Sequence, residues 1–125
     1  MRLFQRLRSL AVRQEKTASG PEIPVVRLGD AEYCLRRVGR VLPYGMQTAT
    51  EISQLLRREE IPLDLLGDYE SLLAAFERGE WKHLADKLSP LADRDPVASF
   101  LRMYITDRGG TLPVDFEGVI QLVSK

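Results

Sequence analysis

Few side chains in this chain could carry chemistry. His83 is the only histidine and Cys34 the only cysteine in 125 residues. A zinc site needs a set of cysteine and histidine ligands, which these two residues cannot supply. They could form a nucleophile and base pair, but no third group orients them, and Cys34 lies in a predicted strand. We therefore expect a buried structural thiol, and neither a metal nor another cofactor.

Acidic and glycine-rich segments give no catalytic motif either. Asp86, Asp93 and Asp95 are close in sequence, but they lack the twelve-residue register and closing glutamate of an EF-hand. Gly109-Gly110 is not followed by the lysine and hydroxyl residue of a phosphate-binding loop. The sequence therefore predicts that the chain is not an enzyme.

Arginines are the most frequent candidates for binding. Together with Tyr33 and Tyr44, five arginines could form a surface patch that binds nucleic acid. These arginines are Arg36, Arg37, Arg40, Arg57 and Arg58. The whole chain balances 18 basic with 18 acidic residues, and Glu59-Glu60 follow directly. We therefore expect no nucleic-acid binding. Residues 1–60 carry eleven basic and seven acidic residues and residues 61–125 the reverse, so the first half could meet the second half or an acidic partner.

The first predicted element is a basic amphipathic helix over residues 2–14. Leu3, Leu7, Leu10 and Ala11 share one face, which arginines flank. Such a helix can lie on an anionic membrane, or dock on its own domain or on a partner. Residues 15–24 are polar and rich in turn formers, which indicates a linker, so residues 1–24 form a first region.

Residues 25–60 form the second region, with a break at Gly29-Asp30. The alternation over residues 33–42 predicts a strand, and Pro43-Tyr44-Gly45 predicts a turn. Residues 48–56 are ambiguous: Thr48 and Glu51 have capping-box spacing, and the leucines that follow have helical spacing, so local rules favour a helix.

Residues 61–125 predict three helices and a tail. After a connector over 61–67, the first helix is capped by Asp68 and ends at Gly79. Pro90 helps to end the second, and the third begins at Asp95-Pro96 and ends at Gly109-Gly110. The apolar stripes are, in order, Tyr69, Leu72, Leu73 and Phe76; Trp81, Leu84, Ala85 and Leu88; and Val97, Phe100, Leu101 and Tyr104. The tail, which contains Phe116 and Ile120, is expected to fold back on the helices.

Residues 69–102 resemble a tetratricopeptide unit. The shared pattern is an aromatic residue, Ala-Phe, Gly, Trp and Ala, followed by a loop and a third helix. The repeat period of that family is about 34 residues. One unit plus a helix is too little for an open superhelical groove.

A second resemblance covers most of residues 33–125, to the C-terminal region of bacterial class III adenylate and guanylate cyclases. The matching positions are Arg37-Val38-Gly39-Arg40-Val41, Gly45 and Thr50 to Leu56, then Tyr69, Phe76, Gly79, Trp81, Ala85, Asp95-Pro96 and Leu101, and finally Phe116 to Val119, Leu122 and Lys125. The resemblance implies that residues 48–56 are a strand paired with 33–42. The family's catalytic residues lie upstream of the matched segment, and Tyr44 replaces a lysine typical of the turn. The resemblance therefore implies shape without catalysis.

Together these patterns predict an α+β protein, in which a small β-hairpin or sheet precedes a TPR-like three-helix bundle and an amphipathic helix stands at the N-terminus. We expect a cytoplasmic regulatory module that binds a protein partner such as a signalling enzyme, and its oligomeric state stays open. The candidate partner-binding residues are Tyr69, Trp81, Tyr104, Arg36, Arg37 and Arg40. The alternatives are an accessory fragment that modulates a class III cyclase in trans, and a peripheral membrane protein held by residues 2–14.

Overall fold

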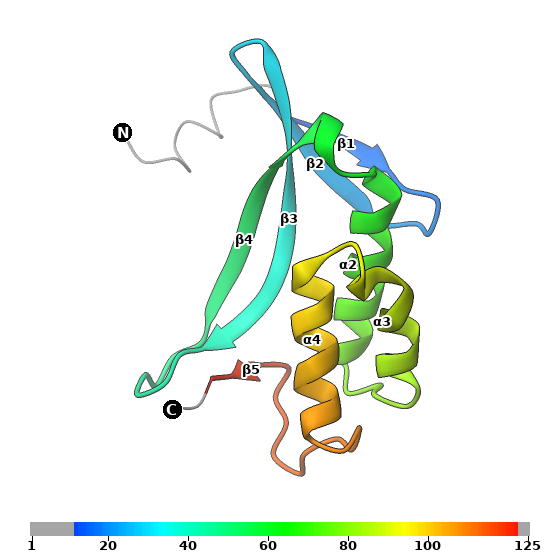
Figure 1. The fold of residues 1–125 in the computed structure, drawn as a ribbon. Helices are drawn as coiled ribbons and strands as arrows, with labels where there is room; N and C mark the ends of the chain where they lie inside the picture. The colour runs from blue at the N-terminus through cyan, green and yellow to red at the C-terminus, as the bar shows by residue number, and fades with distance from the viewer. Residues whose placement is uncertain (1–11, 123–125) are drawn as a thin grey trace. The chain divides into compact units, whose positions relative to one another are not determined.

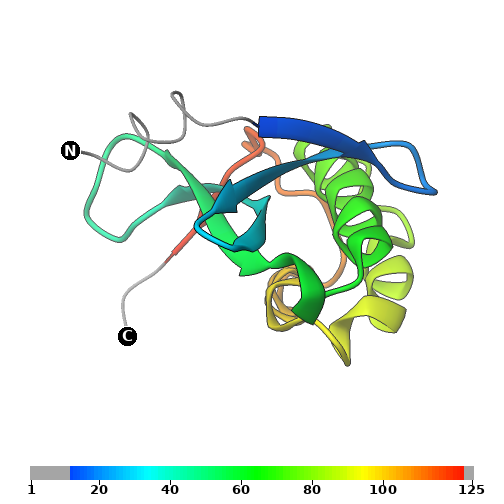
Figure 2. The ribbon, with the colours of Figure 1, turned by 90° about the horizontal axis from the view of Figure 1, so that it is seen from above.

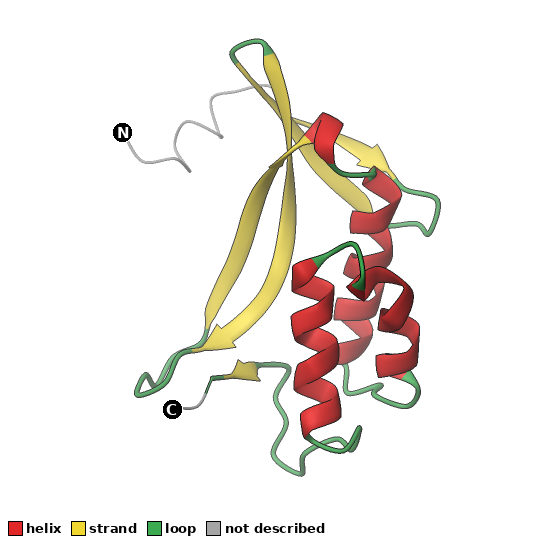
Figure 3. Ribbon diagram, in the orientation of Figure 1, coloured by secondary structure: helices red, strands yellow, loops and turns green. Residues whose placement is uncertain are grey.

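The computed structural model describes residues 12–122. These residues form a mixed sheet and a set of helices (Figures 1 and 3), which confirms the predicted α+β class. The strands are β1 (Val12–Lys16), β2 (Glu22–Leu28), β3 (Ala31–Leu42), β4 (Thr50–Arg57) and β5 (Ile120–Gln121). The helices are η1 (Arg58–Glu60, a 3-10 turn), α2 (Leu63–Glu77), α3 (Leu84–Ala92) and α4 (Pro96–Asp107).

The sheet has the order β1-β2-β3-β4, and the short β5 pairs in parallel with β3. β1 and β2 lie side by side in antiparallel register (Figure 2). The β2–β3 hairpin turns through Gly29-Asp30, because Leu28 pairs with Ala31. Gly29 has a φ of 66°, a conformation that glycine adopts without steric cost and that tight two-residue hairpins require.

The N-terminal predictions need correction. Residues 12–14 belong to β1, so the predicted helix cannot extend to residue 14, and its remainder lies outside the described residues. The predicted linker over 15–24 is also wrong, because it contains the end of β1 and the start of β2. The ladder to β2 satisfies the backbone of these polar residues, a tertiary contact that local sequence does not report.

The strand predictions over 33–42 and 48–56 are confirmed by β3 and β4. The local helix signal over 48–56 is therefore wrong. Leu56 packs against the buried cluster of the sheet, while its neighbour Leu55 lines a hollow that contains none of that cluster. Opposite orientations of adjacent side chains are the strand period, and pairing with β3 outweighs a weak local preference for helix.

The chain divides into two units, and β3, β4 and α2 contribute residues to both. The first unit consists of the chain up to Arg37 together with Ser53–Glu70. Its core joins the sheet to the first turns of α2, through Ile23, Val25, Cys34 and Leu66, with Leu56, Ile61 and Leu63 packed around them.

The second unit consists of Val38–Ile52 and the chain from Ser71 onward. Its buried side chains come from the end of α2, from α3 and α4, which pack against each other, and from β5. The largest of these are Leu73, Phe76, Trp81, Leu84, Leu88, Leu101, Tyr104, Ile105 and Ile120.

Helix boundaries differ from prediction at three places. The predicted second helix includes Trp81, but α3 begins at Leu84. α2 begins at Leu63, inside the predicted connector, so Asp68 lies within the helix and does not cap it. Burial of Leu65 and Leu66 explains the extra turn. Pro90 lies inside α3 and does not end it. Proline removes only one backbone donor, and the buried Leu91 holds the next turn in place.

The start of α4 and the course of the tail are as predicted. Asp95 is the N-cap of α4, and its side chain accepts a hydrogen bond from the Val97 amide at 3.1 Å. In the tail, the Phe116 ring packs edge-on against Phe76 and Trp81 with centroids 5.1 and 5.2 Å away. The tail therefore closes the aromatic core of the second unit before β5 pairs with β3.

Candidate interaction site

The three aromatic residues predicted to bind a partner are buried. Tyr69, Trp81 and Tyr104 are 1%, 3% and 8% exposed. The Trp81 ring stacks on Phe76 with centroids 5.2 Å apart, and its Nε1 donates to the Phe76 carbonyl oxygen at 3.2 Å. The Tyr104 hydroxyl accepts a hydrogen bond from the Gln121 amide at 2.9 Å. These rings stabilise the fold and leave almost no surface for a partner.

The three candidate arginines occupy different environments. Arg36 is 3% exposed, and its guanidinium lies 4.6 Å from the centroid of the Tyr69 ring, a cation–π contact. Arg37 is half-buried and pairs with Glu70 at 3.0 Å. Arg40 is exposed. The surface that the sequence predicts around these residues is therefore reduced to Arg40 and part of Arg37.

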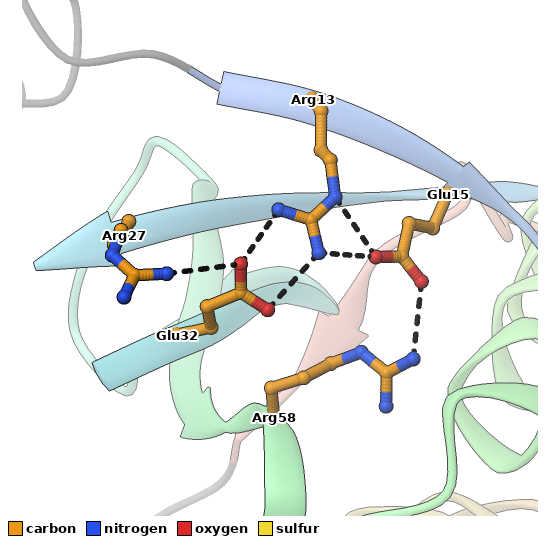
Figure 4. Close-up of polar contacts among 5 residues, drawn as sticks. All are labelled: Arg13, Glu15, Arg27, Glu32 and Arg58. Carbon is orange, nitrogen blue, oxygen red and sulfur yellow. Dashed lines mark hydrogen bonds and ion pairs between the residues drawn. The ribbon is translucent and has the colours of Figure 1, made fainter. Parts of the chain in front are cut away.

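A network of five charged residues lies on one face of β1, β2 and β3 (Figure 4). The Arg13 guanidinium contacts both Glu15 and Glu32, with nitrogen–oxygen distances of 2.6 and 2.7 Å. Arg58, from η1, reaches Glu15 at 3.1 Å, and Arg27 lies 3.8 Å from Glu32. The network therefore links three strands to the turn that follows β4.

The network fixes the protonation of its acids. Hydrogen bonds from Arg13, and for Glu15 also from Arg58, lower the pKa of both carboxyl groups below the ordinary value of 4.5. Both acids are therefore ionised at neutral pH and each faces an arginine. A general acid must hold a proton near working pH, so neither carboxyl group can act as a general acid at neutral pH.

The single cysteine and histidine do not gain reactivity. Cys34 is fully buried, and desolvation raises the pKa of its thiol, which makes the thiolate less accessible. His83 is exposed and precedes α3 with a left-handed φ of 61°. Across residues 12–122, no three His, Cys, Asp or Glu side chains group closely enough to hold a metal ion.

A hollow on the second unit offers a surface that a partner could enter. We call it the Trp81 hollow. It has a volume of about 330 Å³ and opens between the end of α2 and the start of α3. Its lining is Leu72, Ala75, Gly79, Glu80, Trp81, Lys82, Leu84 and Lys87. Its accessible apolar surface comes mainly from Leu72 and Ala75, because Trp81 and Leu84 are almost fully buried beneath it, and charged groups stand among them.

The local sequence explains why this hollow forms. Gly79 ends the last turn of α2 with a φ of 82°, and the Glu80 amide returns to the Ala75 carbonyl oxygen at 2.9 Å. This glycine-terminated cap satisfies the final carbonyls of the helix. It turns the chain sharply, so that Trp81 enters the core while Glu80 and Lys82 remain exposed.

The rim of the Trp81 hollow is positively charged. Glu80 accepts two hydrogen bonds from Arg78, at 2.9 and 3.0 Å, which lower its pKa. Its charge is therefore compensated by a cation outside the lining. Lys82 and Lys87 are exposed lining residues, so two lysines stand beside the single Glu80 in the lining, and Lys87 also helps to lower the pKa of Glu80.

A second hollow of about 390 Å³ lies in the first unit. Pro21 to Pro24 and Leu35 form part of its lining, and Arg37 and Glu70 complete it. These two charged residues pair with each other. Glu22, which is exposed, adds a negative charge to this lining, so the Trp81 hollow is the better candidate for an acidic partner.

Sequence reasoning identified the neighbourhood of Trp81 but missed Lys82 and Lys87. The sequence signal that could have indicated them is the position of two lysines beside the first apolar residues of a helix, immediately after a glycine cap. Comparisons with known proteins add no assignment: no protein family, curated protein or solved structure matches the chain. Among the described residues, no helix is both long and apolar enough to cross a membrane.

Proposed function

We propose that this chain is a non-catalytic protein-interaction module that binds an acidic segment of a partner protein in the Trp81 hollow. The proposal rests on one observation, which is that an apolar hollow has Lys82 and Lys87 exposed at its rim. An apolar side chain of the partner would contact Leu72 and Ala75. Carboxylates on either side of that anchor would face the lysines.

The size of the hollow sets the expected strength of binding. Its volume of about 330 Å³ is at the lower end of ligand pockets. Burying one leucine or phenylalanine contributes about 1.5–3 kcal/mol, and each exposed ion pair adds roughly 0.2–1 kcal/mol. These contributions sum to roughly 2–5 kcal/mol, and the lost translational and rotational freedom of the partner must be subtracted from them, so a single anchor binds with a Kd of about 1 mM or weaker. A single anchor thus gives weak, reversible binding, as a regulatory contact requires.

The partner class is a separate matter. A signalling enzyme, and a class III cyclase in particular, is suggested by the resemblance of residues 33–125 alone. The binding chemistry of the hollow does not depend on that resemblance, because it follows from an apolar lining and two lysines. The proposal therefore specifies an acidic segment with an apolar anchor and leaves the identity of the enzyme to experiment.

Selection from a random peptide library displayed in many copies on each phage, so that avidity retains weak binders, tests the proposal. The full chain is immobilised, and retained peptides are sequenced and their affinities measured. We expect enrichment of peptides that carry one large apolar residue flanked by aspartate or glutamate. Enrichment of basic or uncharged peptides would contradict the proposed chemistry.

Charge-reversal variants locate the binding. Lys82→Glu combined with Lys87→Glu is expected to weaken selected peptides by roughly tenfold or more, since each 1.4 kcal/mol changes Kd tenfold. Arg40→Glu with Arg94→Glu is a matched control, because both arginines are exposed on the same unit but neither lines the hollow. Equal losses in the two double variants would indicate nonspecific charge attraction and reject the Trp81 hollow.

A further inference from the structure

The loop that follows α4 lies beside the Trp81 hollow. This loop and the turn between α2 and α3 are at the same end of the helices (Figure 1). Leu112 packs on Gly79, since its Cδ2 atom is 3.3 Å from the position that a Cβ of that glycine would take. Four residues later, the Phe116 ring packs edge-on against Trp81. Gly79 and Trp81 both line the hollow, so the loop contacts lining residues at two points.

Between these two contacts the chain forms a β-turn. The Phe116 amide donates to the Pro113 carbonyl oxygen at 3.2 Å, which places Val114 and Asp115 at the two central positions. We call residues 112–117 the Val114 turn. Val114 is fully exposed and Leu112 is 41% exposed. Single exposed apolar residues are common on protein surfaces, but these two adjoin a hollow that is itself partly apolar, and an apolar patch that continues in this way marks an interaction surface.

The Val114 turn carries the opposite charge to the rim of the hollow. Asp115 and Glu117 are exposed, and they line a small hollow of about 100 Å³ together with Arg108. Two carboxylates thus stand beside one guanidinium, which leaves a net negative charge. Lys82 and Lys87 give the rim of the Trp81 hollow a net positive charge. The combined surface therefore has apolar groups and two regions of opposite charge.

We propose that the Val114 turn is a second subsite for the protein segment that enters the Trp81 hollow. This inference rests on the proposed function and adds to it the chemistry of the partner. One apolar residue of the segment occupies the hollow, and a second contacts Leu112 and Val114. Acidic residues of the segment face the lysines of the rim, and a lysine or arginine faces Asp115 and Glu117.

A second subsite changes both the strength and the direction of binding. Burial of a second apolar side chain lowers Kd by about tenfold or more. The two regions of opposite charge fix which way the segment runs, because the reverse direction places like charges together. The partner is therefore a segment with acidic residues towards one end and a basic residue towards the other.

Stepwise peptide selection on the full chain tests the proposal. The starting peptide is one that is retained by wild type and weakened by the Lys82→Glu and Lys87→Glu double variant. Its apolar anchor and acidic flanks are kept, and the positions on either side are randomised. We expect the tighter peptides to gain an apolar residue and a lysine or arginine on one side only. Any other enrichment, or no gain in affinity, would overturn the proposal.

Serine variants locate the gain. Leu112→Ser with Val114→Ser should weaken the extended peptides by about tenfold or more and leave the affinity for the starting peptide unchanged. Val114→Ser alone replaces a fully exposed side chain, so it keeps the fold and should account for part of the loss. Met46→Ser with Met103→Ser is the matched control, because both methionines are exposed on the same unit and neither lines the two hollows. Equal losses in the two double variants would overturn the second subsite.

The two peptides also separate this inference from the proposed function. Extended peptides that are weakened by the lysine double variant but not by the serine variants would overturn the second subsite and leave the Trp81 hollow in place. Peptides retained by wild type that are all insensitive to the lysine double variant would reject both the hollow and the second subsite.

Discussion

At the scale of single residues, Phe76 is the centre of the second unit. Its ring stacks on Trp81 and meets Tyr104 and Phe116 edge-on, with centroids between 5.1 and 6.0 Å away. Offset-stacked and edge-to-face pairs add about 0.5–1.5 kcal/mol beyond burial. A cluster of this kind gives the helical unit a single packed arrangement.

Phe76→Ala should therefore strongly destabilise the protein. Removing a buried phenylalanine costs about 3–5 kcal/mol, because apolar contacts are lost and a cavity is left. Urea denaturation followed by circular dichroism measures the loss. Tyr44→Ala is the control, since Tyr44 is 69% exposed and surface substitutions stay within about 0.5 kcal/mol. A similar loss in both variants would contradict the assignment of the core.

Glu32 links stability to pH. Hydrogen bonding to Arg13 lowers its pKa below 4.5, so the folded state favours the ionised form. That stabilisation is complete above the unfolded pKa and is lost as pH falls through the lower folded pKa. The Tm of wild type should thus exceed that of Glu32→Gln at neutral pH, and the difference should shrink below about pH 4.5.

The control for that prediction is Glu60→Gln, at an exposed glutamate of η1. This variant replaces a glutamate that is not one of the five residues of the network. A difference between wild type and Glu32→Gln that grows as pH falls would contradict the role of the Arg13 network.

Sequence reasoning at this scale succeeded where hydropathy and spacing agree. Phe76 and Trp81 stand on apolar helical stripes, and burial follows from that. Arg36 could not be predicted, because an arginine in the middle of a strand normally points to solvent. It is buried because its planar guanidinium covers the Tyr69 ring, a contact between residues more than thirty positions apart.

Among the elements, α4 has the best-defined start. The Asp95 side chain is 2% exposed and accepts from the Val97 amide. Asp95→Ala should cost about 1–2 kcal/mol in urea denaturation, since an N-cap satisfies a backbone donor that otherwise has no partner. Asp95→Asn should retain most of the stability. An alanine variant as stable as wild type would show that the cap is dispensable.

The contact between α2 and the β1–β2 turn gives a second prediction. Gly67 is buried within α2, and an added Cβ would overlap the Thr17 side chain. Gly67→Ala should therefore destabilise by about 1–3 kcal/mol, although alanine is the better helix former by about 1 kcal/mol. Urea denaturation measures both effects together.

Thr17→Gly separates them, because it removes the overlapping atoms. Thr17 Oγ1 also donates to the Pro21 carbonyl oxygen at 2.7 Å, so the Thr17 variant alone should lose some stability. In its background, Gly67→Ala should cost less than in wild type. Additive losses in the double variant would show that the two residues do not meet.

The helices and strands that could be predicted are those whose formation depends on local sequence patterns. α4 was found because a cap, a proline and an apolar stripe coincide within a few residues. β1 was missed because its sequence, VRQEK, is polar and is held by pairing with β2. Residues 48–56 needed the resemblance to cyclases to be predicted as a strand, since local spacing favoured a helix.

At the scale of the molecule, charge is organised locally in each unit. Some of the eleven basic residues among the first sixty form ion pairs within the chain, such as Arg13 with Glu32 and Arg37 with Glu70. Lys82 and Lys87 belong to the acidic half of the chain, yet they form a basic rim. The site proposed for an acidic partner is therefore in the half of the chain whose summed charge is negative, and not in the basic half that the summed charge favours. Only the turn after α2 places these lysines beside an apolar wall.

The most direct test of the interaction proposal is an NMR titration of the isotope-labelled chain with an acidic peptide that carries one leucine or phenylalanine. The account predicts that the largest amide shift changes fall on residues lining the Trp81 hollow, between positions 72 and 87, and that they are lost in the Lys82→Glu and Lys87→Glu double variant. Largest changes elsewhere on the chain, or saturation unaffected by that double variant, would contradict it.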